Sequence, residues 1–375
     1  LGLNVNHPDS SACLLIDGIL VGAISEERLG DRKKHTNAFP INSIKFLMSE
    51  NGVRLKDIDH IALANDPKSN LKQKILFSLS NFNEFKSMFQ NFRYKTNNPI
   101  NSLHILLGAS KKEMNFITHN VEHHLAHISS SYYCSDFDGL SAGMSFDGSG
   151  DFVSCMTAKC EGNKIEVIKR IHLPNSLGHF YSSLCQFIGF DKYGEEYKVM
   201  GLAPYGEPSY MEELKNLISY KNGDFFLNKK YFNVSKGFKS QISDQTQQGK
   251  YYTNNLIKLL GTPRNRKEII GKKEKDIAKS VQLTFEKISL ELLIDLQKNI
   301  SINNLNLSGG CALNGVLNTK IYENLPVKKM FIQPAASDDG TSIGAAYYCW
   351  HNILNKKKRF FLENPYLGSN YSEEQ

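Results

Sequence analysis

The sequence predicts a duplicated α/β fold in which two lobes face one another across a cleft. Residues 1–25 read as three short strands joined by turns, "LGLNVNH", "SACLLID" and "ILVGAIS". The same plan recurs from Leu140 as "LSAGMSFD", "DFVSCMTAK" and "KIEVIKRIH". A β-meander that opens each half of a chain is typical of a duplicated domain. An ordinary pair of hairpins in one mixed sheet would give the same local pattern.

The first turn of each half is predicted to point into the cleft. These turns lie near residues 7–11 and 147–151, and the second is expected to consist of Gly148, Ser149 and Gly150. Glycine lets backbone amides approach an anion closely, so this turn is a candidate anion site. The layout resembles the nucleotide-binding fold of the actin, sugar kinase and Hsp70 type.

The first half continues with a helix and a long insertion. Pro40 and Gly52 frame a helix over about 41–51. The stretch 66–115 is rich in Asn, Phe, Ser and Lys and reads as an insertion. We assign residues 1–135 to the first lobe on this basis.

The second half ends in a regular alternation of strands and helices. "KDIAKSVQLTFEKISLELLIDLQK" has apolar residues at helical spacing and predicts a long amphipathic helix. A strand "NLNLSGG", a helix from about 312, a strand "KKMFIQP" and a helix from about 339 follow. This βαβα order suits a doubly wound lobe, which we assign to residues 136–355. The polar stretch 209–270 inside it shows no clear pattern.

Composition bounds the class of protein. With 375 residues, 41% hydrophobic and 22% charged, the chain is long enough for two lobes. It contains no signal-peptide pattern and no apolar run of the roughly 18 to 20 residues that span a bilayer, so a cytoplasmic protein without a membrane partner is expected. The net charge of +7 is dispersed, which favours a solvated surface over a nucleic-acid footprint. Seven cysteines without a CxxC pair indicate buried thiols.

The segment "VEHHLAH" places three of the eleven histidines within seven residues. His123 and His127 are four residues apart, so on a helix both imidazoles lie on one face and can reach one metal ion, while His124 points elsewhere. Ordinary packing of two histidines is the alternative. The spacing is that of a zincin helix, but Leu125 and Ala126 leave no glutamate for a general base.

Carboxylates at predicted strand ends could complete a metal site. Asp147 ends the first strand of the second half, and Asp338 and Asp339 lie between a strand and a helix. Two histidines and two aspartates suit iron or manganese as readily as zinc, and the sequence does not decide among them.

Three further segments are candidates for ligand binding. "LSGGCALNG", residues 307–315, follows a strand and opens a helix, where backbone amides can meet a phosphate or a ribose. "SEERLGDRKKHTNAFP" offers Arg28 and Lys34 to phosphate or carbonyl oxygens, unless it is a solvated turn. "EEYKVMGLAPYGEP" is an irregular loop of the kind that often carries function, although a plain surface connection would look alike.

Together these segments resemble the motifs of the NodU/CmcH family of O-carbamoyltransferases. They occur in the family order and cover essentially all of residues 1–350. The resemblance implies an actin-like domain similar to the subunit that makes threonylcarbamoyladenosine in tRNA. It implies a divalent metal, expected to be Fe(II), and it favours Asp338 over Asp339 as a ligand.

The resemblance also implies roles for particular residues. His7 would be the base for the acceptor hydroxyl or would position the carbamoyl group, and Lys34 would join it in catalysis. The implied metal ligands are His123, His127, Asp147 and Asp338. The residues expected to bind the adenosine and phosphate parts of a nucleotide are Gly309, Gly310 and Asn314, and Gly148, Ser149 and Gly150.

The implied reaction has two stages. ATP and carbamoyl phosphate give carbamoyl adenylate on a YrdC-like domain, and the carbamoyl group then passes to a hydroxyl of a sugar or natural product. Residues 356–375 resemble the lead-in to that C-terminal domain, which this sequence lacks, so the domain would act either in cis within a longer protein or in trans from another polypeptide. A homodimer is left open, and a nucleic-acid partner is not expected.

Two other functions are compatible with parts of the pattern. A transferase that makes threonylcarbamoyladenosine in tRNA would match the HxxGH form of the helix motif, but Ala126 stands in the place of its glycine. A noncatalytic nucleotide-binding scaffold would be favoured by broken metal ligands, and the four candidate ligands are intact.

Overall fold

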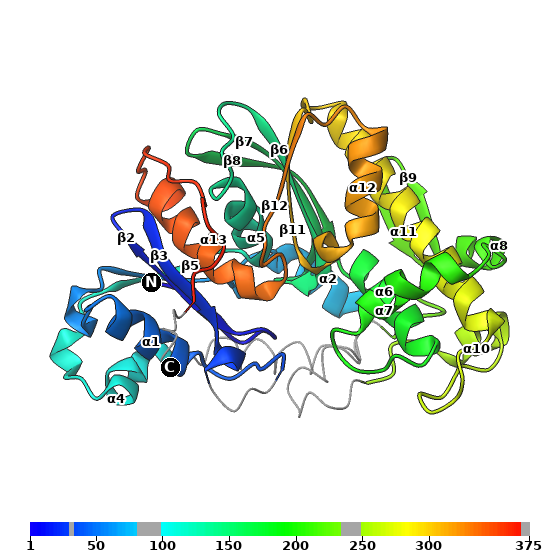
Figure 1. Cartoon of the computed structure of the whole chain (residues 1–375), viewed down its shortest axis with the longest axis horizontal. Coiled ribbons are helices and arrows are strands. Elements are labelled where there is room, and N and C mark those ends of the chain that lie inside the picture. The colour runs from blue at the N-terminus through cyan, green and yellow to red at the C-terminus, as the bar shows by residue number, and fades with distance from the viewer. Residues whose placement is uncertain (30–33, 81–98, 234–248, 369–375) are drawn as a thin grey trace, which may run out of the picture.

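Two five-stranded sheets with the same strand order form the framework of the protein (Figure 1). The computed structural model describes residues 1–29, 34–80, 99–233 and 249–368. The first sheet has the order β3-β2-β1-β4-β5 and the second has the order β8-β7-β6-β11-β12. Each sheet begins with an antiparallel meander and is completed by two parallel strands. This repeat confirms the predicted duplicated fold of the actin, sugar kinase and Hsp70 type.

The first sheet follows the predicted strands closely. Its strands are β1 (Gly2–Asn4), β2 (Ser11–Ile16), β3 (Ile19–Ser25), β4 (His60–Leu63) and β5 (Ile117–Asn120). The predicted helix after Pro40 is α1 (Ile41–Glu50), which buries Ile44 and Leu47 against this sheet. The predicted insertion falls between β4 and β5 and contains α2 (Leu71–Ser80) and α4 (Leu103–Leu107). Its residues 81–98 lie outside the described part of the chain.

The second sheet repeats the meander on a larger scale. Its strands are β6 (Ser141–Gly150), β7 (Val153–Glu161), β8 (Lys164–His172), β11 (Asn304–Ser308) and β12 (Lys329–Ile332). The predicted turn at 148–150 is wrong, because β6 runs through Gly150 and the chain reverses at Asp151 and Phe152, whose φ angles are 49° and 75°. An irregularity in the β6–β7 pairing between Phe146 and Gly150 takes up the extra residues. Aspartate tolerates the left-handed region better than most residues, which suits it to this turn.

Several helices surround the second sheet. The predicted long helix is α11 (Lys272–Gln297), which buries Phe285 and Leu292 in the core of this lobe. The helices α6 (Leu177–Phe187), α7 (Glu196–Leu202) and α12 (Gly315–Asn324) pack with it. The stretch 209–270 contains α8 (Met211–Lys215), β9 (Ile218–Lys221), β10 (Asp224–Leu227) and α10 (Asn254–Leu260). Its residues 234–248 lie outside the described part.

Two helices fill the space between the sheets (Figure 1). The helix α5 (His123–Tyr132) contacts β6, β7 and β11 of the second sheet, whereas α13 (Thr341–Tyr348) contacts β1, β2 and β4 of the first. The two helices also pack on each other, and Gly344 lies so close to the carbonyl of Ala126 that a side chain there would overlap it. This contact brings the start of α5 near the start of α13. The lobe limits at 1–135 and 136–355 remain a prediction.

Residues beyond α13 run back across the first lobe. Arg359 donates to the carbonyl oxygens of Tyr132, Ser135 and Phe137, and Ala23 of β3 donates its N–H to the carbonyl of Leu367. The predicted lead-in at 356–375 is therefore anchored over the part that the structure describes. Its residues 369–375 lie outside that part.

Candidate metal centre and adjoining cavity

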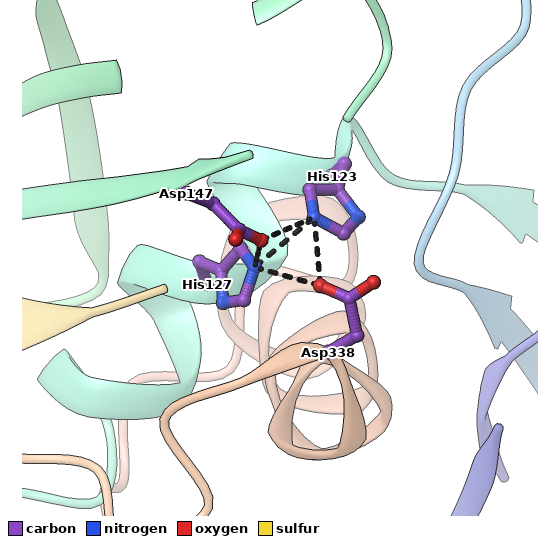
Figure 2. Close-up of side chains that lie close together, drawn as sticks. All are labelled: His123, His127, Asp147 and Asp338. Carbon is purple, nitrogen blue, oxygen red and sulfur yellow. Dashed lines mark hydrogen bonds and ion pairs between the residues drawn. The ribbon is translucent and has the colours of Figure 1, made fainter. Parts of the chain in front are cut away.

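His123 and His127 project from the first turns of α5 toward one point (Figure 2). Their Nε2 atoms lie 3.0 Å apart, and both side chains are fully buried. The helical spacing predicted from the sequence is therefore realised, and His124 points elsewhere, with Nδ1 2.8 Å from Ser145 Oγ and Nε2 3.0 Å from the carbonyl of Val153.

Two aspartates from distant parts of the chain complete the cluster. Asp147 comes from β6, and Asp338 comes from the short 3₁₀ turn of residues Asp338–Gly340 that precedes α13. Asp147 Oδ2 lies 3.3 Å from His127 Nε2 and 3.7 Å from His123 Nε2. Asp338 Oδ1 lies 3.5 and 3.4 Å from the same two nitrogens. The adjacent Asp339 instead accepts the backbone N–H of Gly340.

These separations fit four donors around a single cation. Ligand atoms that each lie about 2.1 Å from a metal ion are about 3.0 to 3.4 Å from one another at octahedral or tetrahedral angles. The four donor atoms all lie within 4.8 Å of one another, and the five ion-pair and nitrogen separations run from 3.0 to 3.7 Å. The two imidazole nitrogens and two carboxylate oxygens therefore fit a divalent transition metal, without selecting one.

The charges of the cluster are tightly balanced. Burial opposes protonation of His123, but the carboxylates of Asp338 and Asp147 outweigh it and raise the pKa of this imidazole to about 10. Burial works against ionisation of Asp147 as well, yet hydrogen bonding to His123 and His127 lowers its pKa to about 2. The two acidic groups thus demand positive charge nearby, which a proton or a metal cation can supply.

His7 lies directly against this cluster. Its ring stacks on that of His123 with centroids 4.6 Å apart, and its Nδ1 lies 3.6 Å from Asp338 Oδ2. The side chain is only 3% exposed. This packing holds the ring of His123 and the carboxylate of Asp338 in place.

A cavity of about 430 Å³ adjoins the cluster and is lined by Asp147 and Asp338. Of the residues predicted to bind a nucleotide, Gly148, Ser149, Gly310 and Asn314 also line it. Ser176 caps α6 and donates to the carbonyl of Gly148 at 2.7 Å, which fixes this strand end beside the cavity. These four residues therefore share one cavity wall with the two aspartates of the cluster.

Two of the predicted nucleotide residues, Gly150 and Gly309, pack closely against their neighbours, and Asn314 forms hydrogen bonds within the fold. Gly150 lies against the ring of His123 and Gly309 against the backbone of Phe146, so a Cβ at either position would overlap its neighbour. Gly309 also has a φ of +90°, which glycine adopts without strain. The side-chain amide of Asn314 caps α12 through Leu317 N–H and exchanges two hydrogen bonds with Gln282, of 2.9 and 3.0 Å. Its side chain therefore acts on the shape of the cavity rather than facing it freely.

Arg28 and Lys34 also line the cavity. Beside Lys34, the structure reveals a cluster that sequence reasoning missed. His35 Nδ1 lies 2.6 Å from Asp9 Oδ1, and the His35 N–H donates to Glu27 Oε2 at 2.7 Å. Its φ of 59° is left-handed. In the sequence, the only sign that His35 belongs to the site was its position next to Lys34.

The segment 195–208 also supplies cavity residues that were not singled out. Glu196, Tyr197 and Met200 of α7 line the cavity, together with Tyr193 just before that helix. The sequence predicted an irregular loop for "EEYKVMGLAPYGEP", which is wrong for residues 196–205, because they form α7 and a short 3₁₀ helix. Among the described helices, none has the length and apolarity to cross a bilayer.

Comparison of the sequence with known families places the chain in a family of transferases. The chain belongs to the carbamoyltransferase N-terminus family, whose model matches residues 1–347. This finding confirms the resemblance drawn from the sequence motifs.

Two relatives of this chain are longer than the chain itself. It is 34% identical to an uncharacterized protein of Synechocystis over 390 residues, which is 100% of this chain and 61% of that protein. It is 28% identical to Nodulation protein NolNO of Sinorhizobium fredii over 382 residues, 98% of this chain and 50% of the relative. The chain thus spans about half to three fifths of these relatives. HypF from T. kodakarensis aligns with a TM-score of 0.41 and 14% identity over 94% of this chain and 48% of that one.

Proposed function

We propose that the chain is the transfer domain of an ATP-dependent O-carbamoyltransferase. In this proposal it moves a carbamoyl group from carbamoyl adenylate to a hydroxyl of a small acceptor such as a sugar or natural product. The observation that carries the proposal is the cluster of His123, His127, Asp147 and Asp338 at the wall of a cavity, in a chain of the carbamoyltransferase N-terminus family.

Each part of the site has a role in this reaction. A divalent metal such as Fe(II), when bound, would act as a Lewis acid toward the carbamoyl carbonyl. His7 would keep His123 and Asp338 in their orientation, because it contacts both. Lys34 and Arg28 would attract the phosphate of the donor, since both line the cavity and carry positive charge. The backbone of residues 148–149 and 310 would face the same donor.

The donor would be made elsewhere. Carbamoyl phosphate and ATP would give carbamoyl adenylate on a YrdC-like domain. That domain would belong either to a longer protein that includes this chain or to a separate polypeptide. The length of the relatives, of which this chain spans 50% to 61%, supports such an additional region. After transfer, AMP would leave the cavity.

A reconstituted assay tests the proposal. The purified chain is mixed with a YrdC-like domain, carbamoyl phosphate, ATP and a panel of sugars, and carbamoylated products are sought by mass spectrometry. We expect a product that disappears with His127→Ala and persists with the matched control His104→Ala, whose histidine lies on α4. Carbamoylation of added tRNA instead of the sugars would favour the tRNA-modifying alternative. If AMP and carbamoylated products formed equally well without the chain, the proposal would be overturned in favour of a noncatalytic nucleotide-binding scaffold.

A further inference from the structure

The start of the insertion crosses from the first sheet to the second. Residues 66–70 come after β4 and lead directly into α2. On α2, the ring of Phe77 packs edge-to-face against that of Phe152 in the turn between β6 and β7, with the two centroids 5.4 Å apart. The segment 66–80 therefore leaves one sheet and contacts the other.

Asn70 is the residue at which the polar contacts of this segment converge. Its Nδ2 donates to Glu122 Oε1 at 2.9 Å and to the carbonyl of Asp151 at 3.1 Å. Its Oδ1 lies 3.2 Å from Nε2 of His172, the last residue of β8. Because Oδ1 is an acceptor, the imidazole is the donor in that contact. One side-chain amide thus joins the residue before α5, the turn after β6 and the end of β8.

Two of these partners flank the backbone of His123. Glu122 directly precedes His123 in the chain, and its carboxylate is also held by Arg170 of β8 through bonds of 2.7 and 2.9 Å. Asp151 Oδ2 accepts the N–H of His123 at 2.9 Å. A displacement of Asn70 would therefore reach His123 from two directions, through the chain itself and through the turn that binds its backbone.

The backbone around Asn70 fixes the amide in this place. Its φ of 54° lies in the left-handed region, which asparagine adopts more readily than most residues. Its carbonyl accepts the N–H of Lys74 at 3.0 Å in the first turn of α2. Asp66 adds a second link to the turn after β6, because its N–H donates to Asp151 Oδ2 at 2.7 Å.

We propose that Asn70 is a positioning residue that couples docking of the segment 66–80 to metal binding, an inference that rests on the metal centre of the proposed function. Asn70 holds Glu122 and the turn at Asp151, which hold the first turn of α5 and so direct the imidazole of His123 toward the two aspartates of the cluster. Coupling between two binding events is reciprocal. A metal ion that fixes His123 must therefore also stabilise the docked segment.

Hydrogen exchange followed by mass spectrometry measures the docking of the segment 66–80 directly. The purified chain is compared without metal and with saturating Fe(II) under anaerobic conditions, and metal affinity is measured by competition with a chelator. The test variant is Asn70→Gly, because glycine adopts the left-handed conformation without strain and only the side-chain amide is lost. The matched control is Asn222→Gly, whose exposed asparagine has the same φ of 54° between β9 and β10.

In the wild-type chain and in Asn222→Gly, we expect Fe(II) to slow exchange both in α5 and in the segment 66–80. Asn70→Gly should bind Fe(II) about fivefold more weakly, at the lower end of the usual coupling between two sites. Saturating Fe(II) should still slow exchange in α5 of this variant, but no longer in the segment 66–80. Asn70→Asp keeps the size of the side chain but replaces the amide donor to Glu122 with a carboxylate, so it should behave in the same way.

Three results would overturn the coupling. In the first, Fe(II) slows exchange in α5 of the wild-type chain and leaves the segment 66–80 unchanged. In the second, Asn70→Gly binds Fe(II) as tightly as wild type and exchanges faster in the segment to the same extent with and without metal, which would limit Asn70 to folding. In the third, Asn70→Asp keeps wild-type affinity and protection. A wild-type chain that binds no Fe(II) would contradict the metal centre of the proposed function itself, and the coupling with it.

Discussion

The carboxylate of Asp151 accepts the backbone N–H of His123 at 2.9 Å. The same Oδ2 accepts the N–H of Asp66 at 2.7 Å, just after β4 of the first lobe. One buried side chain therefore joins the start of the helix that carries both imidazoles to the loop that opens the insertion. An acceptor at a helix N-terminus also satisfies a backbone donor that has no partner within the helix.

Removing this carboxylate should loosen the metal site. We expect Asp151→Ala to leave one buried and one partly buried N–H group without this acceptor, at a cost of about 2 kcal/mol in the free energy of unfolding. Metal affinity should fall about tenfold, as it does when groups that orient metal ligands are lost. Chemical denaturation and metal titration measure the two effects, with the exposed Asp138→Ala as control. Unchanged metal affinity in a destabilised Asp151→Ala variant would show that Asp151 acts on folding alone.

Metal binding should also be sensitive to a side chain at Gly150, for a steric reason. A methyl group at position 150 would overlap the ring of His123, so the ring would have to move. We expect Gly150→Ala to lose bound metal while most of the fold remains. Gly201→Ala is the matched control, because a Cβ there meets no atom within 4 Å. The metal content of the purified variants tests this prediction. A Gly150→Ala variant with its metal site fully occupied would contradict it.

Asn314 should matter for stability before it matters for ligand binding. Its side chain caps α12 and exchanges two hydrogen bonds with Gln282, which also accepts from Tyr181 at 2.7 Å. We expect Asn314→Ala to lower the free energy of unfolding by about 2 kcal/mol, the sum of a lost cap and an unpaired buried amide. Thermal denaturation measures this, and Asn324→Ala on the same helix is the control. An Asn314→Ala variant as stable as wild type would contradict this prediction.

The sequence predicted much of the fold because its elements are periodic or sharply bounded. The meander of residues 1–25, the long helix α11 and the closing βαβα order all follow local rules that need no knowledge of distant contacts. The pair of His123 and His127 follows for the same reason, since it depends only on helical spacing. The turn after β6 was misplaced because a strand irregularity between Phe146 and Gly150, which depends on pairing with β7, takes up the intervening residues.

The missed residues share a different feature. His35 gains significance only beside Asp9, which is 26 positions away, and Glu196 only beside Ser182 and Asp147. Such relationships arise from packing between elements that are far apart in the sequence. The hydrogen bonds between Asn314 and Gln282 could not be predicted either, because Gln282 lies 32 positions away on α11.

The Glu195–Arg266 pair should make stability depend on acidity. Hydrogen bonds from Arg266 lower the pKa of Glu195 to about 2, below its ordinary 4.5. The folded pKa is depressed, so the pair stabilises the fold above about pH 4.5, and the contribution is lost as the pH falls toward 2. We expect Arg266→Met to be about 1 kcal/mol less stable than wild type at pH 7 and about equal to it near pH 2 to 3. Urea denaturation across this range measures the difference, and a constant gap would refute the prediction.

Anomalous X-ray scattering from crystals of the purified chain, recorded at the absorption edge of its bound metal, tests the central claim most directly. The account predicts one peak about 2.1 Å from the Nε2 atoms of His123 and His127 and close to the carboxylates of Asp147 and Asp338. A strong peak between Asp9, Glu27 and His35 instead, or none near the histidines in protein purified with added Fe(II), would contradict it.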